Sequence, residues 1–256
     1  MRRGVLIILL LAVAFQGLSM SQDNMSMEEL WGAANTNYAE ARFEEALKGY
    51  TAIYEQGYVS EPLMYNIANC HFKLRNWGKA ILYYERALKI NPGNKDVKNN
   101  LKLAKDFAVD KIEELPEFVL TTWVRDSNYL LKSDTWAYLS LTFFLLSVLL
   151  LLNFRYGRSS VRRKASFFLS MASLLVGIIF TLFAWSQRSA YHRRDTAIVM
   201  MPVSTVRSSP DISGNTLFIL HEGTKVKLIE QLGSWKRVEL SDGRQGWISE
   251  GDIEMI

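Results

Sequence analysis

Side chains that could perform chemistry are few and scattered along this 256-residue chain. The three histidines, His71, His192 and His221, lie far apart, and no metal-ligand spacing surrounds them. A glycine-rich phosphate loop and a nucleophile elbow are both missing from the sequence. The sequence therefore predicts no catalytic constellation, no metal site and no cofactor, and we expect a protein that is not an enzyme.

The single cysteine, Cys70, rules out a disulfide within the chain. It stands between Ala68 and Phe72 in an apolar context. No second cysteine accompanies it to support a redox role. We expect Cys70 to be a small core residue, because free cysteine behaves as a small hydrophobe.

The positive charge of the chain is unevenly distributed. The formal net charge is +4 and the isoelectric point is about 9.0. Residues 22–115 nevertheless carry 12 Lys/Arg against 14 Asp/Glu, and residues 196–256 carry 6 against 8. The surplus therefore flanks apolar runs, where it signals membrane topology. Nucleic-acid binding is not expected, since it needs basic residues spread over a folded face.

Residues 1–21 have the pattern of a signal peptide. Arg2 and Arg3 precede an apolar stretch of 11 residues, Val5 to Phe15. That stretch is too short to span a bilayer, which needs about 20 helical residues. The alternative is an uncleaved anchor that extends through Leu18. Both interpretations place the chain after residue 22 outside the cytoplasm.

Two uncharged apolar runs follow, at 136–154 and 165–185, with 19 and 21 residues. At about 1.5 Å per residue, each can cross a hydrocarbon core of about 30 Å. Aromatic rings near their ends favour the headgroup layer. Small and polar residues within the runs predict close helix packing. These are Ser140, Thr142, Ser147, Ser166, Ser170, Ser173 and Gly177.

The loop between the runs, residues 155–164, is strongly basic. Its positive charges are Arg155, Arg158, Arg162, Arg163 and Lys164. The positive-inside rule places such a loop in the cytoplasm. Both soluble regions, with their linkers at 116–135 and 186–195, would then face the extracytoplasmic side of a bacterial cytoplasmic (inner) membrane, which is the periplasm.

Residues 22–115 contain a repeat with a fixed offset of 34 residues. Copies at 27–60 and 61–94 match at small and aromatic positions: Ala34 with Ala68, Asn35 with Asn69, Ala46 with Ala80 and Tyr50 with Tyr84. This period resembles tetratricopeptide repeats, and an amphipathic stretch at 95–115 fits a capping helix. The alternative is an unrelated bundle of helical hairpins.

The tetratricopeptide resemblance implies an all-α domain with a concave groove lined by the first helix of each repeat. The groove candidates are Trp31, Asn35, Tyr38, Tyr65, Asn69, Phe72 and Lys73. The amides of Asn35 and Asn69 could hold the backbone of an extended peptide. The alternative is that Asn merely recurs at this position of the repeat.

Residues 196–256 alternate apolar and polar residues, which predicts about five short strands and a small all-β barrel. "HEGTKVKLIE", "GSWKRVEL" and "GRQGWISEGDI" resemble bacterial SH3-like domains. Trp235 and Trp247 are surface candidates for binding peptides or sugars. Alternatively, both rings pack the barrel.

The order of segments is signal, tetratricopeptide repeats, membrane hairpin and SH3-like barrel. It resembles the E-type members of the Bacteroides aerotolerance (Bat) family. The resemblance implies a membrane complex with other Bat proteins, some with von Willebrand A-type domains, and a link to oxygen or envelope-stress tolerance. We therefore expect a scaffold that binds proteins, or alternatively a protein that attaches to peptidoglycan through the barrel.

Overall fold

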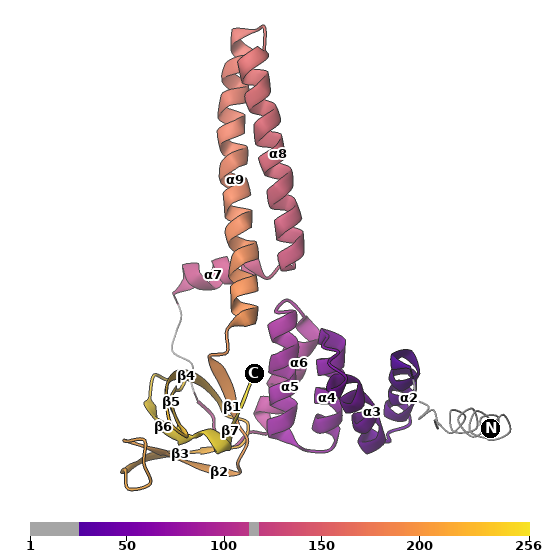
Figure 1. The fold of residues 1–256 in the computed structure, drawn as a ribbon, viewed down its shortest axis with the longest axis vertical. Helices are drawn as coiled ribbons and strands as arrows, with labels where there is room; N and C mark the ends of the chain where they lie inside the picture. Colours follow the sequence, from indigo (N-terminus) through magenta and orange to yellow (C-terminus); the bar gives the residue numbers. More distant parts are fainter. Residues whose placement is uncertain (1–25, 113–117) are drawn as a thin grey trace, which may run out of the picture. The chain divides into compact units, whose positions relative to one another are not determined.

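The computed structural model describes residues 26–112 and 118–256 (Figure 1). The expected signal peptide, residues 1–21, lies outside the described residues. The chain divides into two compact units, residues 1–56 and 57–256.

The described part of the first unit is a helical hairpin of α2 (Met27–Ala39) and α3 (Phe43–Glu55). Ser26 and Glu29 form a capping box, because each side chain accepts a hydrogen bond from the other's backbone N–H. The two helices meet where residues are small. A Cβ on Gly49 would lie 3.0 Å from the Cβ of Ala34, so the close approach depends on glycine there.

The second unit begins with three helices: α4 (Glu61–Lys73), α5 (Trp77–Ile90) and α6 (Lys95–Asp106). Ser60 and Asn94 cap α4 and α6 by accepting backbone hydrogen bonds. The matched residues Ala68 and Ala80 of the second repeat are fully buried. Small residues there allow α4 and α5 to pack closely, as the repeat predicts.

The helix expected over 95–115 ends earlier, at Asp106. The Lys111 amino group folds back and donates hydrogen bonds to the carbonyls of Lys105 and Asp106, at 2.9 and 2.8 Å. Such bonds satisfy carbonyls that the helix end leaves without partners. Residues beyond Asp106 instead form contacts with the C-terminal sheet. These tertiary contacts override the helical pattern of the sequence.

The segment expected to be a linker, 116–135, contains a further helix, α7 (Val119–Asn128). It has ten residues and an apolar side. The sequence does indicate this helix, because apolar residues recur at helical spacing at Val119, Leu120, Trp123 and Val124. Such a short run is easily read as part of a linker.

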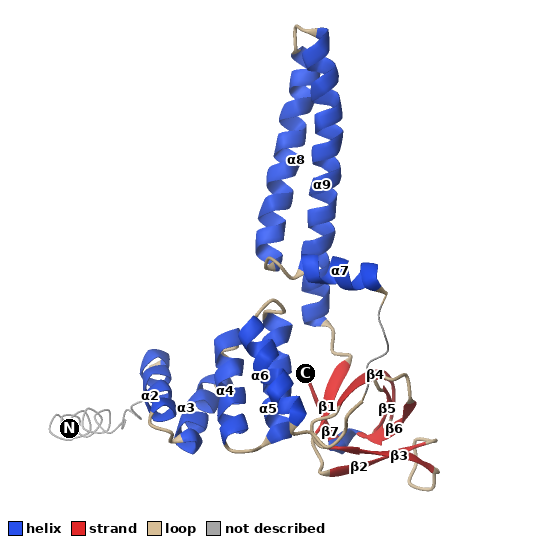
Figure 2. Cartoon of the chain, turned by 180° about the vertical axis from the view of Figure 1, so that it is seen from behind, coloured by secondary structure: helices blue, strands red, loops and turns tan. Residues whose placement is uncertain are grey.

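The two apolar runs form α8 (Ser133–Tyr156) and α9 (Ser160–His192), which pack as a long hairpin (Figure 2). Both helices extend beyond the predicted spans, and residues 157–159 alone connect them. Each is long and apolar enough to cross a membrane, and only 11% and 17% of their most apolar windows are buried. Core helices of soluble proteins are mostly buried, unlike these two.

The hairpin packs through the small residues that the sequence indicated. Six of the seven are buried, whereas Thr142 is exposed and bonds within its own helix. Ser147 donates to the carbonyl of Ser170, and Ser170 donates to that of Ser147, both at 3.1 Å. Ser140 donates to the carbonyl of Gly177 at 3.0 Å. The prediction is therefore confirmed for all but Thr142.

The C-terminal region is one antiparallel sheet of seven strands, here called the barrel because it curls around a single core. The strands are β1 (Thr196–Val199), β2 (Val203–Arg207), β3 (Thr216–His221), β4 (Lys225–Leu232), β5 (Trp235–Glu239), β6 (Gln245–Ser249) and β7 (Ile253–Met255). Their spatial order is β3-β2-β6-β5-β4-β1-β7. The sequence pattern indicated about five strands, since strands as short as β1 and β7 show little alternation.

Candidate binding surfaces

The groove candidates of the first unit all contact side chains of α3. The Asn35 side-chain oxygen accepts a hydrogen bond from the Tyr50 hydroxyl at 2.6 Å. The Trp31 ring lies edge-on to Tyr50, with 5.4 Å between centroids, and Tyr38 lies edge-on to Phe43 at 5.3 Å. Asn35 therefore helps to join the two helices of its own repeat.

The second unit repeats this arrangement. The Asn69 oxygen accepts from the Tyr84 hydroxyl at 2.6 Å and from the Asn100 amide at 3.2 Å. Asn100 also donates to the Tyr65 hydroxyl at 2.9 Å, which links α6 to α4. Among the described residues, the Asn69 amide nitrogen has no hydrogen bond. The oxygen of Asn69 thus helps to position α4, α5 and α6.

The remaining candidates lie further along α4. The Phe72 ring contacts Trp77 and Phe107 edge-on, at 5.3 and 5.9 Å between centroids. Trp77 and Phe107 stack in parallel at 4.3 Å. Lys73 is exposed on the last turn of the helix. Phe72 is therefore part of an aromatic cluster where α4 and α6 end.

The helix α6 also contributes to this side of the repeat, which the 34-residue pattern does not indicate. Asn100 and Leu103 lie on one side of α6, and Phe107 directly follows the helix. Leu103 and Phe107 are 52% and 54% exposed. The 34-residue offset aligns Leu103 with Asn69, but the observed partner of Asn69 is Asn100. We call the surface formed by Tyr65, Asn69, Phe72, Asn100, Leu103 and Phe107 the groove face.

The barrel contacts α5 through residues 221–225, here called the docking turn. The backbone N–H of Gly78 donates to the Glu222 carboxylate at 3.0 Å. An anion there is favourable because the first turn of a helix has unpaired N–H groups and a positive dipole end. Gly223 has φ +90, and a Cβ on it would lie 2.9 Å from the Cδ1 of Ile81. Glycine therefore serves both the turn and the contact.

A buried carboxylate lies at the centre of this interface. Glu85 on α5 is 7% exposed and pairs with Lys225 at 2.7 Å and with Lys105 at 3.3 Å. Burial alone would raise the pKa of Glu85, but the two lysine charges and their hydrogen bonds outweigh it and lower the pKa. Glu85 is consequently charged at neutral pH and joins α5, α6 and the barrel.

Asp110 forms a second junction with the docking turn. Its carboxylate accepts from the His221 backbone N–H at 2.7 Å and from the Thr224 hydroxyl at 2.6 Å. The His221 Nδ1 lies 2.8 Å from the other carboxylate oxygen. Desolvation raises the pKa of Asp110, and the hydrogen bonds from Thr224 and His221 lower it by more. These contacts hold the segment after α6 against the barrel.

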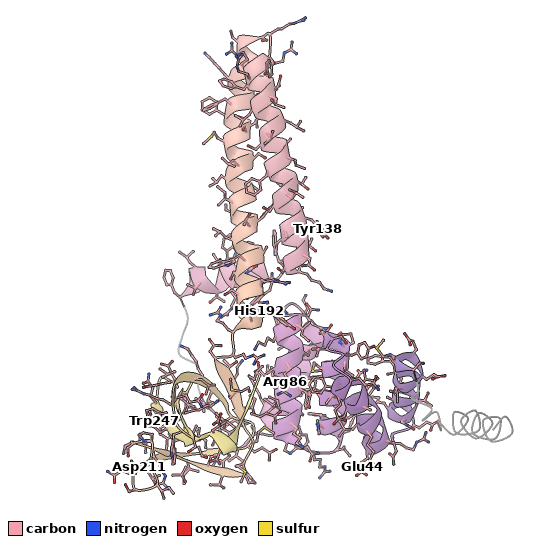
Figure 3. All side chains as sticks on the ribbon, in the orientation of Figure 1. Glu44, Arg86, Tyr138, His192, Asp211 and Trp247 are labelled. Carbon is pink, nitrogen blue, oxygen red and sulfur yellow. The ribbon has the colours of Figure 1, made fainter. Side chains whose placement is uncertain are left out.

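The last strand provides the third part of the interface. Arg86 donates to the Glu254 carboxylate at 2.9 Å and to the Met255 carbonyl at 2.7 Å. Lys89 donates to the Ile256 carbonyl at 2.7 Å. Figure 3 labels Arg86 on α5. The barrel thus covers a side of α5, although the two lie on opposite sides of the α8–α9 hairpin in the sequence.

Trp235 and Trp247 share the outer face of the barrel. Directly opposed residues of antiparallel strands lie on one face, and Trp235 opposes Ser249 while Arg237 opposes Trp247. Arg207 opposes Trp247 from the other side. The core face of β6 holds Gly246 and Ile248 instead. Both rings are partly exposed and form an aromatic and cationic surface with the two arginines.

The basic residues near the hairpin tip are all exposed: Arg155, Arg158, Arg162, Arg163 and Lys164. Only Arg158 lies in the connection itself, since the helices extend into the expected loop. Arg163 donates to the Phe154 carbonyl at 3.1 Å. The structure gathers these positive charges at one end of the hairpin.

Two buried titratable residues lie side by side on α4. Cys70 is fully buried, which confirms it as a core residue, and burial raises its pKa to about 12. Burial, with a smaller contribution from the charge of Lys79, lowers the pKa of His71 to about 4. The described residues contain no group of His, Cys, Asp or Glu that could hold a metal ion.

Comparison with known families assigns two segments of the chain. Residues 62–94 match the tetratricopeptide repeat, and residues 203–254 match the bacterial SH3 domain. No curated protein matches the chain. Both families are binding modules, so the helical region with α4 and α5 and the C-terminal barrel are of types that bind proteins or peptidoglycan.

Proposed function

We propose that this chain is a non-enzymatic scaffold, anchored in the bacterial cytoplasmic membrane, whose repeats and barrel bind envelope proteins on the extracytoplasmic side. The observation that carries the proposal is the docking of the barrel on α5. Glu85 and Lys225 pair at 2.7 Å although a two-helix hairpin separates them in the sequence. Two binding modules joined in this way would act as one recognition unit.

The hairpin supports the membrane part of the proposal. Its polar groups bond across the helix pair, as Ser147 and Ser170 do, while apolar side chains cover the outside. Lipid favours this arrangement, because it offers no hydrogen bonds to polar groups. Two spans return the chain to the same side of the bilayer, as the contact between α5 and the barrel requires. The basic tip would then be cytoplasmic.

The groove face is the proposed protein-binding site. The barrel contacts α5, whereas exposed Leu103 lies on α6 and exposed Phe107 directly follows it. Asn100 of the same helix bonds to Asn69, whose amide nitrogen has no hydrogen bond among the described residues. An extended peptide could place apolar side chains on these residues and a backbone carbonyl on the amide. The order of segments supports a Bat-type envelope complex, linked to aerotolerance or stress tolerance, as the setting.

Affinity purification of the full chain from crosslinked membranes tests this function. We expect specific envelope proteins, including ones with von Willebrand A-type domains, to be recovered with the wild type and lost when Leu103 and Phe107 are both changed to Ser. The matched control changes Lys102, an exposed residue of α6 outside the groove face, to Ser. Recovery of no envelope protein in several mild detergents would contradict the scaffold proposal.

A specific observation favours a second function, attachment to peptidoglycan. The outer face of the barrel places Trp235 and Trp247 beside Arg207 and Arg237. Aromatic faces bind sugars, and guanidinium groups pair with carboxylates such as those of wall peptides. The full chain in detergent should then sediment with purified sacculi, and the Trp235→Ala, Trp247→Ala double variant should not. Wild-type protein that stays in the supernatant would exclude this function.

A further inference from the structure

The helix α7 has an apolar face that the other described residues, 26–112 and 129–256, leave uncovered. At about 100° per residue, helical geometry places Val119, Leu120, Trp123 and Val124 within an arc of about 140°. Thr121 lies about 130° from the centre of that arc. The four apolar side chains are 77%, 61%, 68% and 46% exposed. Exposed apolar faces of this kind usually mark an interaction site.

The C-terminal end of α7 is fixed to the open end of the α8–α9 hairpin, near the start of α8 and the end of α9. The Asn128 carbonyl accepts hydrogen bonds from the Trp136 indole at 2.8 Å and from the Gln187 amide at 2.6 Å. The Gln187 amide also donates to the Asn128 side-chain oxygen at 3.0 Å and to the Leu131 carbonyl at 2.9 Å. These bonds form a rigid polar junction between α7 and both long helices.

This junction determines the depth of α7 relative to the apolar spans. Trp136 begins the first apolar run, and Gln187 lies two residues after the second run ends at Trp185. Two residues of helix rise about 3 Å, so Asn128 lies at the level where hydrocarbon gives way to headgroups. Figures 1 and 2 show α7 running across the hairpin rather than along it.

We propose that α7 is an interfacial helix whose apolar face inserts into the headgroup layer of the bilayer that the hairpin crosses. The occupant is lipid because the Asn128 junction holds α7 at the level where the exposed apolar sides of α8 and α9 end. Trp123 is central on the face, and tryptophan favours the interface. Interfacial helices of this kind bury their apolar side about 5–10 Å deep. The inference depends on the membrane hairpin of the proposed function.

Fluorescent labelling of the full chain in vesicles tests this inference. Three single-cysteine variants receive an environment-sensitive dye: Val119→Cys on the apolar face, Thr121→Cys about 160° away on the same helix, and Leu149→Cys on the outside of α8. Cys70 is retained, because its thiol is buried and its pKa of about 12 keeps it unreactive at neutral pH. None of the three positions contributes to the Asn128 junction.

The vesicles consist of phosphatidylcholine and phosphatidylglycerol with a spin label high or low on the acyl chain. We expect the dye at 149 to be quenched by the deep label. The dye at 119 should lose about half of its emission to the shallow label, and the dye at 121 little, because interfacial burial is limited to one face. If the dyes at 119 and 121 are equally exposed to water while the dye at 149 is quenched, α7 is not an interfacial helix, but the membrane hairpin is retained. No quenching at 149 would overturn the membrane hairpin as well.

Discussion

Glu222 of the barrel accepts a hydrogen bond from the backbone N–H of Gly78, 144 residues earlier in the chain, at 3.0 Å. The carboxylate caps the first turn of α5, so a side chain of one module completes the helix of another. A Cβ on Gly78 would lie 2.4 Å from the Glu222 side chain, so this approach depends on glycine. The repeat and the barrel therefore form one structural unit.

Changing Gly223 to Ala should weaken this docking. Gly223 has φ +90 and faces Ile81, whereas Gly233 has φ +59 and nothing within 4 Å of an added Cβ. Both Ala variants incur the left-handed backbone strain of about 1–2 kcal/mol. Only the Gly223 variant also disturbs α5. Hydrogen exchange of the α5 amides should accelerate in Gly223→Ala and remain at the wild-type rate in Gly233→Ala. Equal exchange rates in the two variants would argue against a docking role.

Changing Lys225 to Met should destabilise the interface by about 1–3 kcal/mol, because it leaves the buried Glu85 with one partner instead of two. Lys227 is the control, since solvent screens its exposed pair with Glu239. Urea unfolding of the full chain in detergent compares the two Met variants. A loss for Lys225→Met no larger than that for Lys227→Met would show that Glu85 does not join the modules.

The docking should also be sensitive to acid. The pKa of Glu85 is lower in the folded protein than its ordinary value of 4.5, so the folded state favours the carboxylate. Its contribution is present above that ordinary pKa and is lost as the pH falls through the lowered value. The midpoint of urea unfolding should fall below about pH 4.5 in the wild type. Glu85→Gln should weaken the dependence of the urea midpoint on pH. An unchanged dependence in this variant would contradict the role of Glu85 in the acid sensitivity.

His71 should lower the stability of the second repeat at a pH less acidic than the one at which Glu85 is protonated. Its pKa is lowered from 6.5 to about 4, because burial opposes the charged ring. Between these values the unfolded chain binds a proton that the folded protein does not, so stability falls as the pH falls from 6.5 to 4. The loss amounts to at most about 3 kcal/mol. His71→Gln should remove the pH dependence in this window, and a persistent dependence would assign it to other groups.

Asn69 allows the structural and binding roles of one side chain to be separated. Asn69→Asp keeps an oxygen for the Tyr84 hydroxyl and the Asn100 amide but removes the N–H donors. Asn69→Ala removes both and should destabilise the repeat by about 1–2 kcal/mol. We expect the Asp variant to keep wild-type stability in thermal unfolding and to lose partner capture. Capture by a stable Asp variant at the wild-type level would leave Asn69 with a structural role only.

Local sequence patterns were sufficient to predict the repeat helices and the membrane hairpin. The 34-residue period locates the helices around Ala68 and Ala80, and the serines at 140, 147 and 170 mark the hairpin interface. Periodicity carries this information because one face of each element is buried. Thr142 was assigned wrongly, since small polar residues also bond to their own helix, as Thr142 does with Tyr138.

Contacts between distant segments could not be predicted in the same way. Glu85 and Asp110 read as ordinary charges on helix surfaces, and nothing in the sequence marks Lys225 or Thr224 as their partners. The early end of α6 follows from the same contacts, because Asp110 bonds to the docking turn. Asn100 was missed because it lies 31 residues from its partner Asn69 and therefore outside the 34-residue register.

The scaffold function depends on both modules lying on the extracytoplasmic side of the membrane. Protease added to spheroplasts of the native host, followed by detection of the repeats and of the barrel, tests it most directly. We predict digestion of both modules from outside, while the region around Arg158 remains protected until detergent opens the membrane. Protection of both modules, together with cleavage near Arg158, would contradict the proposed topology and the scaffold function that depends on it.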